Sequence, residues 1–127
     1  MKVVRLRSLF SGVLFWLLFA HLVHAGRVLE GSPANYRQLL GQLGPDDTLQ
    51  LRSGKYRQGL PVHHLNGRPD KPILITGPEQ GARPVFLGRP GANTVSILDS
   101  SHVTIRNLEL DGLGLPVDAV KAEGYAD

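Results

Sequence analysis

Three acidic residues close to the C-terminus are the ones best suited to bind a cation. Glu109 and Asp111 flank Leu110, so on a strand both carboxylates point to one face. Together with Asp118 they offer the oxygen ligands that Ca²⁺ takes in proteins. A solvated surface is the simpler interpretation of the same residues, and a pair of carboxylates is also the machinery of glycoside hydrolysis. We therefore take Glu109, Asp111 and Asp118 as metal candidates, with Ca²⁺ as the ion and no other cofactor evident.

Lys121 is the one candidate for a catalytic base, since it follows Val120 on an expected strand. Elimination on a uronate needs a base for the proton beside the carboxylate and a cation that neutralises that carboxylate. Asp99 stands 22 residues earlier, which is one period of the chain's repeat, so an Asp99–Lys121 ion pair is a simpler account. Arg89 and Asp111 have the same spacing and the same simpler account. Exposed pairs of this kind contribute about 0–1 kcal/mol.

The remaining polar motifs do not complete a catalytic site. His63 and His64 are adjacent, so on a strand they face opposite ways and cannot easily share a metal. The sequence contains no nucleophile triad, no phosphate-binding loop and no zinc-ligand spacing. The catalytic residues are therefore unknown from the sequence, apart from the candidate Lys121.

The stretch HVTIRNLELDG indicates how these residues would be positioned. Val103 and Ile105 alternate with polar residues as in a half-buried strand, but the next apolar residues are Leu108 and Leu110, so the phase slips by one. In a flat sheet this slip would turn the later side chains to the opposite face. A corner near Asn107, a residue type that tolerates the left-handed conformation, would keep all four in one core.

An apolar pattern recurs about every 22 residues. The copies cover 73–94, 95–116 and, in part, 117–127. Ile73, Val95 and Val117 occupy equivalent positions in this pattern, as do Phe86 and Leu108. Short strands separated by Gly, Pro, Asn and Asp at such a period indicate a solenoid, in which each strand pairs with the equivalent strand one turn away. The predicted fold is therefore all-β, a parallel β-helix.

An ordinary β-sandwich with a bulge near Asn107 is the alternative fold. The repeat favours the β-helix, and so does the scarcity of hairpin dipeptides, of which one Asn-Gly occurs at Asn66.

The segment before the expected strands predicts an amphipathic helix. Ser32 can cap it, and Pro33 suits its first position. One face is apolar and is formed by Tyr36, Leu39, Leu40 and Leu43. Because this helix comes just before the first expected strand, it would serve as the N-terminal cap that a solenoid needs.

Residues 1–25 have the pattern of a secretory signal peptide cleaved after Ala25. Three basic residues lie within the first seven, an almost wholly apolar run follows from Leu9 to Val23, and small residues close the segment. The run is short for a membrane span, which needs about 20 residues, although an uncleaved anchor is the alternative. We expect a secreted or periplasmic protein, with no membrane attachment after cleavage and one domain over 26–127.

The charge of the chain changes when the leader is removed. The sequence has 14 Lys and Arg against 11 Asp and Glu, and three of the basic residues lie in the leader, so 11 face 11 in the mature chain. This balance lacks the basic footprint of a nucleic-acid-binding protein, so no nucleic-acid partner is expected. Since the sequence has no Cys, no disulfide stabilises the fold.

Three stretches resemble secreted right-handed parallel β-helix proteins. PDDTLQLRSGKYRQGLPV (45–62) is similar to their opening coil, NGRPDKPILITGP (66–78) to the next connection, and SSHVTIRNLELDG (100–112) to a regular coil. The nearest group is the chondroitinase B and alginate lyase type of polysaccharide lyase. The resemblance covers about residues 46–127 and implies a right-handed, pectin lyase-like β-helix. It places the family's catalytic basic residues and calcium ligands in later coils, so none of them is assigned here.

Two functions remain open after these observations. The first is the N-terminal part of a secreted enzyme that acts on acidic polysaccharide by β-elimination. The second is a non-catalytic β-helix that binds glycans or serves as a surface scaffold. The scarcity of aromatic residues after residue 25 favours the enzyme. Because the chain ends half a period into its third copy, we also expect a β-helix truncated at its C-terminus and inactive alone. The substrate and the oligomeric state are not indicated.

Overall fold

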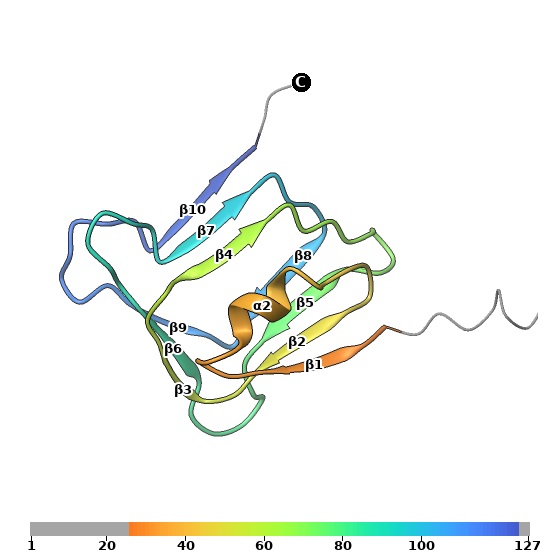
Figure 1. Ribbon diagram of the computed structural model, residues 1–127, viewed down its shortest axis with the longest axis horizontal. Coiled ribbons are helices and arrows are strands. Elements are labelled where there is room, and N and C mark those ends of the chain that lie inside the picture. The colour runs from red at the N-terminus through yellow and green to blue at the C-terminus, as the bar shows by residue number, and fades with distance from the viewer. Residues whose placement is uncertain (1–25, 125–127) are drawn as a thin grey trace, which may run out of the picture.

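The computed structural model describes residues 26–124, and the predicted signal peptide lies outside the described residues. The described chain is almost entirely strand and loop, with one short helix (Figure 1). Its strands form three sheets in which every ladder is parallel. The all-β prediction is therefore confirmed.

The strands are short and are distributed over three sheets. The first sheet has the order β1-β2-β5-β8, formed by Val28–Gly31, Thr48–Leu51, Ile73–Thr76 and Val103–Arg106. The second has the order β3-β6-β9, formed by Gly54–Tyr56, Pro84–Leu87 and Glu109–Asp111. The third has the order β4-β7-β10, formed by Leu60–His63, Val95–Leu98 and Val120–Glu123.

After β1, the chain visits the three sheets in a fixed order. Strands β2, β3 and β4 lie in the first, second and third sheet, and β5 to β7 and then β8 to β10 repeat that sequence. Each strand from β2 to β7 pairs in parallel with the strand three places further along the chain. In Figure 1 the members of each sheet accordingly stack side by side.

The predicted 22-residue register is wrong. Ile73 pairs with Val103, Phe86 with Leu110 and Val95 with Val120, which are intervals of 30, 24 and 25 residues. The interval varies because the connections between strands differ in length. The apolar pattern had matched residues of different sheets, since Ile73 lies in the first sheet and Val95 in the third.

The predicted corner at Asn107 is confirmed. Asn107 has a φ of 57° and lies between β8 and β9, which belong to different sheets. The four apolar side chains around it all pack against the core while remaining partly buried: Val103, Ile105, Leu108 and Leu110. The phase slip in the sequence is therefore a change of sheet.

An aromatic cluster lies in the core between the sheets. Tyr36, Tyr56 and Phe86 are 1%, 0% and 0% exposed. The ring of Tyr56 stacks on that of Phe86 with centroids 4.7 Å apart, and Tyr36 meets both rings edge-on at 5.0 and 5.8 Å. Burial raises the pKa of Tyr56 to about 12. Three of the four aromatic residues after residue 25 are thus structural.

Helix α2 spans Tyr36–Leu40, which is shorter than predicted, and a strand precedes it. Ser32 does not cap the helix; its backbone nitrogen and its hydroxyl lie 2.7 and 3.1 Å from Oδ1 of Asn35. The apolar face is confirmed, because Tyr36, Leu40 and Leu43 are buried and Leu39 packs against them. The helix contacts β1, β2 and β4, so it covers early strands of the first and third sheets (Figure 1).

A nearly buried carboxylate fastens the start of the described chain to β2. Asp47, 5% exposed, accepts a hydrogen bond from the backbone nitrogen of Arg27 at 3.0 Å and pairs with its guanidinium at 2.8 Å. The backbone nitrogen of Gly44 donates to the same carboxylate at 2.8 Å. These donors lower the pKa of Asp47 to about 2, mainly through the hydrogen bond from the Arg27 side chain.

Candidate functional site

A pocket of about 330 Å³ opens on the outer face of the third sheet, where β4 and β7 lie side by side. Side chains alternate along β4, so that Leu60 and Val62 enter the core while Pro61 and His63 face outward. The polar lining comes from α2, the two strands and the loops that precede them: Arg37, Gln58, His63, Arg89, Asn93 and Ser96. We call this site the arginine pocket.

The arginine pocket carries positive charge that no lining carboxylate offsets. Two guanidinium groups and an imidazole line it, and among residues 26–124 no Asp or Glu belongs to its lining. Within residues 26–124, neither Arg37 nor Arg89 takes part in an ion pair; the pairs there join Arg27 to Asp47, His64 to Asp99, Arg106 to Glu79 and Lys121 to Glu123. A concave site lined by one sign of charge concentrates ligands of the opposite sign.

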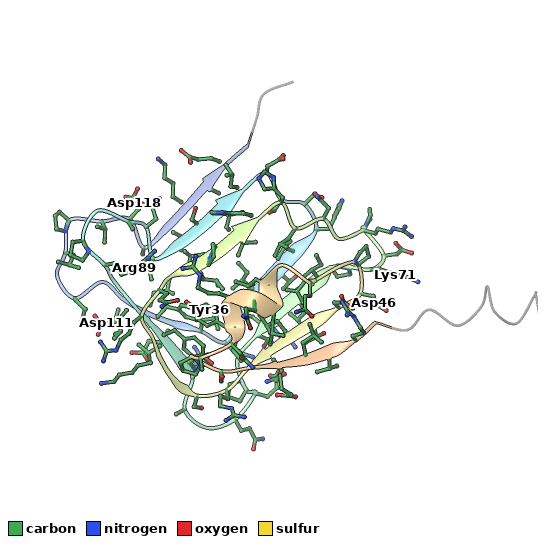
Figure 2. All side chains as sticks on the ribbon, in the orientation of Figure 1. Tyr36, Asp46, Lys71, Arg89, Asp111 and Asp118 are labelled. Atoms are coloured by element: carbon green, nitrogen blue, oxygen red, sulfur yellow. The ribbon has the colours of Figure 1, made fainter. Side chains whose placement is uncertain are left out.

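Arg89 is the least satisfied of the lining side chains. Its Nε is buried and has no hydrogen-bond partner in the described part of the chain. The residue forms a tight turn with Ala92 just before β7, and Figure 2 shows it beside the starts of β7 and β10. A buried donor without an acceptor costs about 1–3 kcal/mol, more when it is charged. An acceptor brought by a ligand would therefore be bound favourably here.

Gly59 leaves the space that the guanidinium of Arg89 occupies. Its φ is +68°, and a Cβ built on it would lie 2.6 Å from Nη2 of Arg89 and 3.1 Å from the carbonyl oxygen of Thr94. The hydroxyl of Tyr36 donates a hydrogen bond to the carbonyl oxygen of Gly59. The core aromatic cluster thus fixes the glycine, and the glycine leaves room for the arginine.

Hydrogen bonds orient two further lining residues. Nη1 of Arg37 donates to the carbonyl oxygen of Gln58 at 2.7 Å. Nε2 of His63 lies 2.9 Å from Oγ of Ser96 on the neighbouring strand. Among residues 26–124 no further hydrogen bond of the Arg37 side chain is found, so its other donors could bind a ligand, and the His63–Ser96 pair offers hydroxyl and imidazole groups on the sheet surface.

Lys121, the predicted catalytic candidate, lies next to the arginine pocket. It pairs in register with Ser96, so its outward side chain neighbours the pocket lining across the β7–β10 ladder. Its Nζ is 2.9 Å from Oε1 of Glu123, and this hydrogen bond raises the pKa of Lys121 above its ordinary value. The ammonium is therefore protonated at neutral pH, and Glu123 would have to move away before Lys121 could act as a base.

The two ion pairs inferred from the 22-residue spacing are wrong. Asp99 lies 3.1 Å from Nδ1 of His64, and Lys121 pairs with Glu123 on its own strand. Arg89 lines the arginine pocket, and the pairs found within residues 26–124 do not join it to Asp111. Both pairs assumed that strands 22 residues apart are neighbours, which the register excludes.

The three predicted calcium ligands, Glu109, Asp111 and Asp118, do not form one site in the described part of the chain. Glu109 and Asp111 are exposed on β9, and Asp118 is exposed in the loop before β10. The backbone nitrogen of Leu113 donates to Oδ1 of Asp111 at 3.0 Å. Figure 2 shows Asp111 and Asp118 at separate places on the surface. Over residues 26–124, no group of three or more His, Cys, Asp or Glu side chains is arranged so that it could hold a metal ion.

Comparisons with known proteins do not assign this site. Neither a family model, nor a curated protein, nor a solved structure matches the chain. None of the helices between residues 26 and 124 has the length and apolar character needed to cross a membrane.

Sequence reasoning missed the basic residues that define the arginine pocket. Arg37 had no assigned role, Arg89 was considered only as a partner of Asp111, and His63 only as a metal ligand. The three belong to a helix, a loop and a strand that are distant in the sequence. The correct assignment of β4 and β7 to one sheet would have brought them together, and the 22-residue register prevented it.

Proposed function

We propose that this protein is an exported right-handed parallel β-helix that binds acidic polysaccharide in the arginine pocket. The observation that carries the proposal is the lining of that pocket: Arg37, Arg89 and His63 converge there, and the described part of the chain brings no carboxylate to them. The ligand group they suit is the carboxylate of a uronate, because guanidinium groups bind carboxylates through paired, charge-assisted hydrogen bonds.

The β-helix part of the proposal rests on the order in which the chain visits its sheets. Three successive circuits, with parallel pairing between equivalent strands, are what stacked coils of a solenoid require. The right-handed sense of the coil and the pectin lyase-like class are inferred from the resemblance of the sequence to secreted right-handed parallel β-helix proteins. Export to the periplasm or the medium comes from the leader pattern of residues 1–25.

The rest of the lining also suits a sugar. Asn93, Ser96 and His63 offer donors and acceptors for hydroxyl groups, and Pro61 and Ala92 supply apolar surface for a ring. Tyr36, Tyr56 and Phe86 are buried in the core and are not available as stacking platforms. Charge and hydrogen bonding, with little aromatic stacking, would therefore account for the affinity.

A second candidate function is β-elimination on the bound polysaccharide. The observation in its favour is the register of Lys121 with Ser96, which brings a further basic group to the edge of the arginine pocket. Arg37 or Arg89 would neutralise the uronate carboxylate, and His63 or a Lys121 freed from Glu123 would take the neighbouring proton. As the carbon–carbon double bond forms, the glycosidic C–O bond would break, and water would protonate the leaving oxygen. Incubation with polygalacturonate, alginate and chondroitin, with and without CaCl₂, tests this function through the absorbance of unsaturated uronates.

Binding to polygalacturonate, measured by isothermal titration calorimetry, tests the primary proposal. The exported protein should bind polygalacturonate and should not bind neutral dextran. Arg89→Ala should weaken binding about 10–100-fold, because a hydrogen bond to a charged group contributes about 1.5–3 kcal/mol. Arg83→Ala removes an exposed arginine outside the pocket and is the matched control. Equal affinities of the wild type and Arg89→Ala, or equal binding of dextran, would contradict the proposal.

A further inference from the structure

Two adjacent carboxylates hold the first described residues. Asp46 accepts a hydrogen bond at Oδ2 from the backbone nitrogen of Gly26 at 3.3 Å. Asp47 accepts one at Oδ1 from the backbone nitrogen of Arg27 at 3.0 Å and pairs with the guanidinium of Arg27. Asp47 therefore has a cationic partner, whereas Asp46 forms no ion pair within the described range.

Gly26 fits closely against Asp46. A Cβ built on Gly26 would lie 2.0 Å from the carbonyl oxygen of Asp46 and 2.9 Å from its Cγ, so a larger residue would displace the backbone. Asp46 is held from its other side, because its backbone nitrogen donates to the carbonyl oxygen of Lys71 at 3.1 Å. Figure 2 shows Asp46 and Lys71 close together beside the start of the described chain.

We propose that hydrolysis of the Ala25–Gly26 peptide bond creates an α-ammonium group at Gly26 that pairs with Asp46. Two independent observations meet at this bond. The leader pattern predicts cleavage after Ala25, and the fold places the nitrogen of Gly26 on a carboxylate that forms no ion pair among residues 26–124. A signal-type peptidase catalyses the step. Water adds across the C–N bond, Ala25 keeps the new carboxylate, and the nitrogen of Gly26 takes up protons to become the ammonium.

The new charge strengthens the attachment of an edge strand. In the uncleaved chain a neutral amide donates over 3.3 Å, which is a long hydrogen bond. The ammonium forms a charge-assisted bond to the same oxygen, and such bonds are shorter and stronger. Gly26 lies two residues before Val28, where β1 begins. The ladder between β1 and β2 is extended toward Gly26 by the hydrogen bond from the backbone nitrogen of Thr48 to the carbonyl oxygen of Arg27. Processing thereby stabilises the first strand of the fold, independently of what the arginine pocket binds.

The test uses the full 127-residue chain expressed with its leader. The N-terminus of the exported product is sequenced, and its Tm is compared with that of Asp46→Asn. Asn keeps the shape of Asp and tolerates the φ of 70° found at residue 46. In parallel, the α-amine of the wild type is acetylated at mildly acidic pH, where an α-amine reacts in preference to the more basic amine of a lysine side chain. Asp70 is also exposed, so Asp70→Asn is the control for loss of a surface carboxylate.

The exported product should begin at Gly26. Asp46→Asn and α-acetylation should each lower the Tm by about 1–4 °C, as expected for a partly exposed ion pair, and both together should lower it no further. Asp70→Asn should leave the Tm unchanged. Another N-terminus, additive effects, or no effect of acetylation would overturn the proposal. Acetylation needs no variant, so the test stands even where Asp46→Asn is not exported.

Discussion

At the scale of single residues, Gly59 and Arg89 show how a backbone position orients a charge. Gly59 adopts a φ of +68°, and its missing side chain leaves the space in which the guanidinium of Arg89 lies. The Tyr36 hydroxyl holds the carbonyl oxygen of the same glycine from the core side. The space available to the Arg89 side chain is therefore bounded by a residue outside the lining of the arginine pocket.

Gly59→Ala should impair the arginine pocket by displacing Arg89. The added methyl group would lie 2.6 Å from Nη2, which is closer than side-chain atoms pack, so the guanidinium must move. We expect the affinity for polygalacturonate to fall about as far as in Arg89→Ala. Calorimetric titration of the two variants and of the double variant checks this, because one shared mechanism predicts no additional loss.

Gly114→Ala is the matched control for the backbone. Gly114 has a φ of +69° and open space around its Cβ position, so it incurs the same left-handed penalty without a clash. If Gly59→Ala binds polygalacturonate as tightly as Gly114→Ala does, Gly59 does not position Arg89.

Asp47 should make the stability of the fold dependent on acidic pH. Its pKa is lowered from an ordinary 3.8 to about 2 in the folded state. The stabilisation is therefore fully present above about pH 4 and is lost as the pH falls through about 2, and it amounts to at most about 2 kcal/mol. Urea unfolding followed by circular dichroism across this range measures the loss.

Asp47→Asn should remove the pH-dependent stabilisation by the Asp47 carboxylate. The variant should be less stable than the wild type at neutral pH, because Arg27 loses its partner. The difference in unfolding free energy between wild type and variant should shrink as the pH falls from about 4 to 2. A difference that stays constant over this range would show that Asp47 is not the titrating group.

At the scale of elements, the cost of truncating an apolar side chain should follow its burial along one ladder. Ile75 on β5 pairs in register with Ile105 on β8. Ile75 is 0% exposed, whereas Ile105 is only partly buried. Ile75→Ala should cost about 2–5 kcal/mol, and Ile105→Ala clearly less.

Urea unfolding of both variants tests this order, with Glu109→Ala as the control. Glu109 is exposed on β9, so its truncation should change the unfolding free energy by no more than about 0.5 kcal/mol. Equal costs for Ile75→Ala and Ile105→Ala would contradict the burial described for β8.

Local features of the elements could be predicted from the sequence, and their pairing could not. The alternation around Val103 and the tolerance of Asn107 for the left-handed region are local properties, so the corner was predicted correctly. The apolar face of α2 follows from helical periodicity in the same way. Strand partners depend on loop lengths, and these make the interval 30 residues at Ile73 but 24 at Phe86. A single repeat length could not describe both intervals.

At the scale of the whole molecule, the arginine pocket is a product of the topology. Arg37, His63 and Arg89 belong to elements that become neighbours only when β4 and β7 join the third sheet and α2 packs near β4. The acidic residues singled out in the sequence, Glu109, Asp111 and Asp118, are instead close to one another along the chain, and the fold leaves all three exposed. Residues brought together by non-local pairing leave no motif in the sequence, whereas the strand that carries Lys121 could be predicted from its local pattern.

In the proposed complex, the guanidinium of Arg89 binds the carboxylate of a polysaccharide ligand. Nitrogen NMR of the arginine Nε–H signals, recorded while a galacturonate oligomer is added, observes the contact directly. We predict that the signal of Arg89, whose Nε has no acceptor among residues 26–124, shifts most and saturates, with Arg37 following. The signal of exposed Arg83 should stay in place. Saturating shifts at Arg83 or Arg106 with none at Arg89, or no shift at any arginine, would contradict the account.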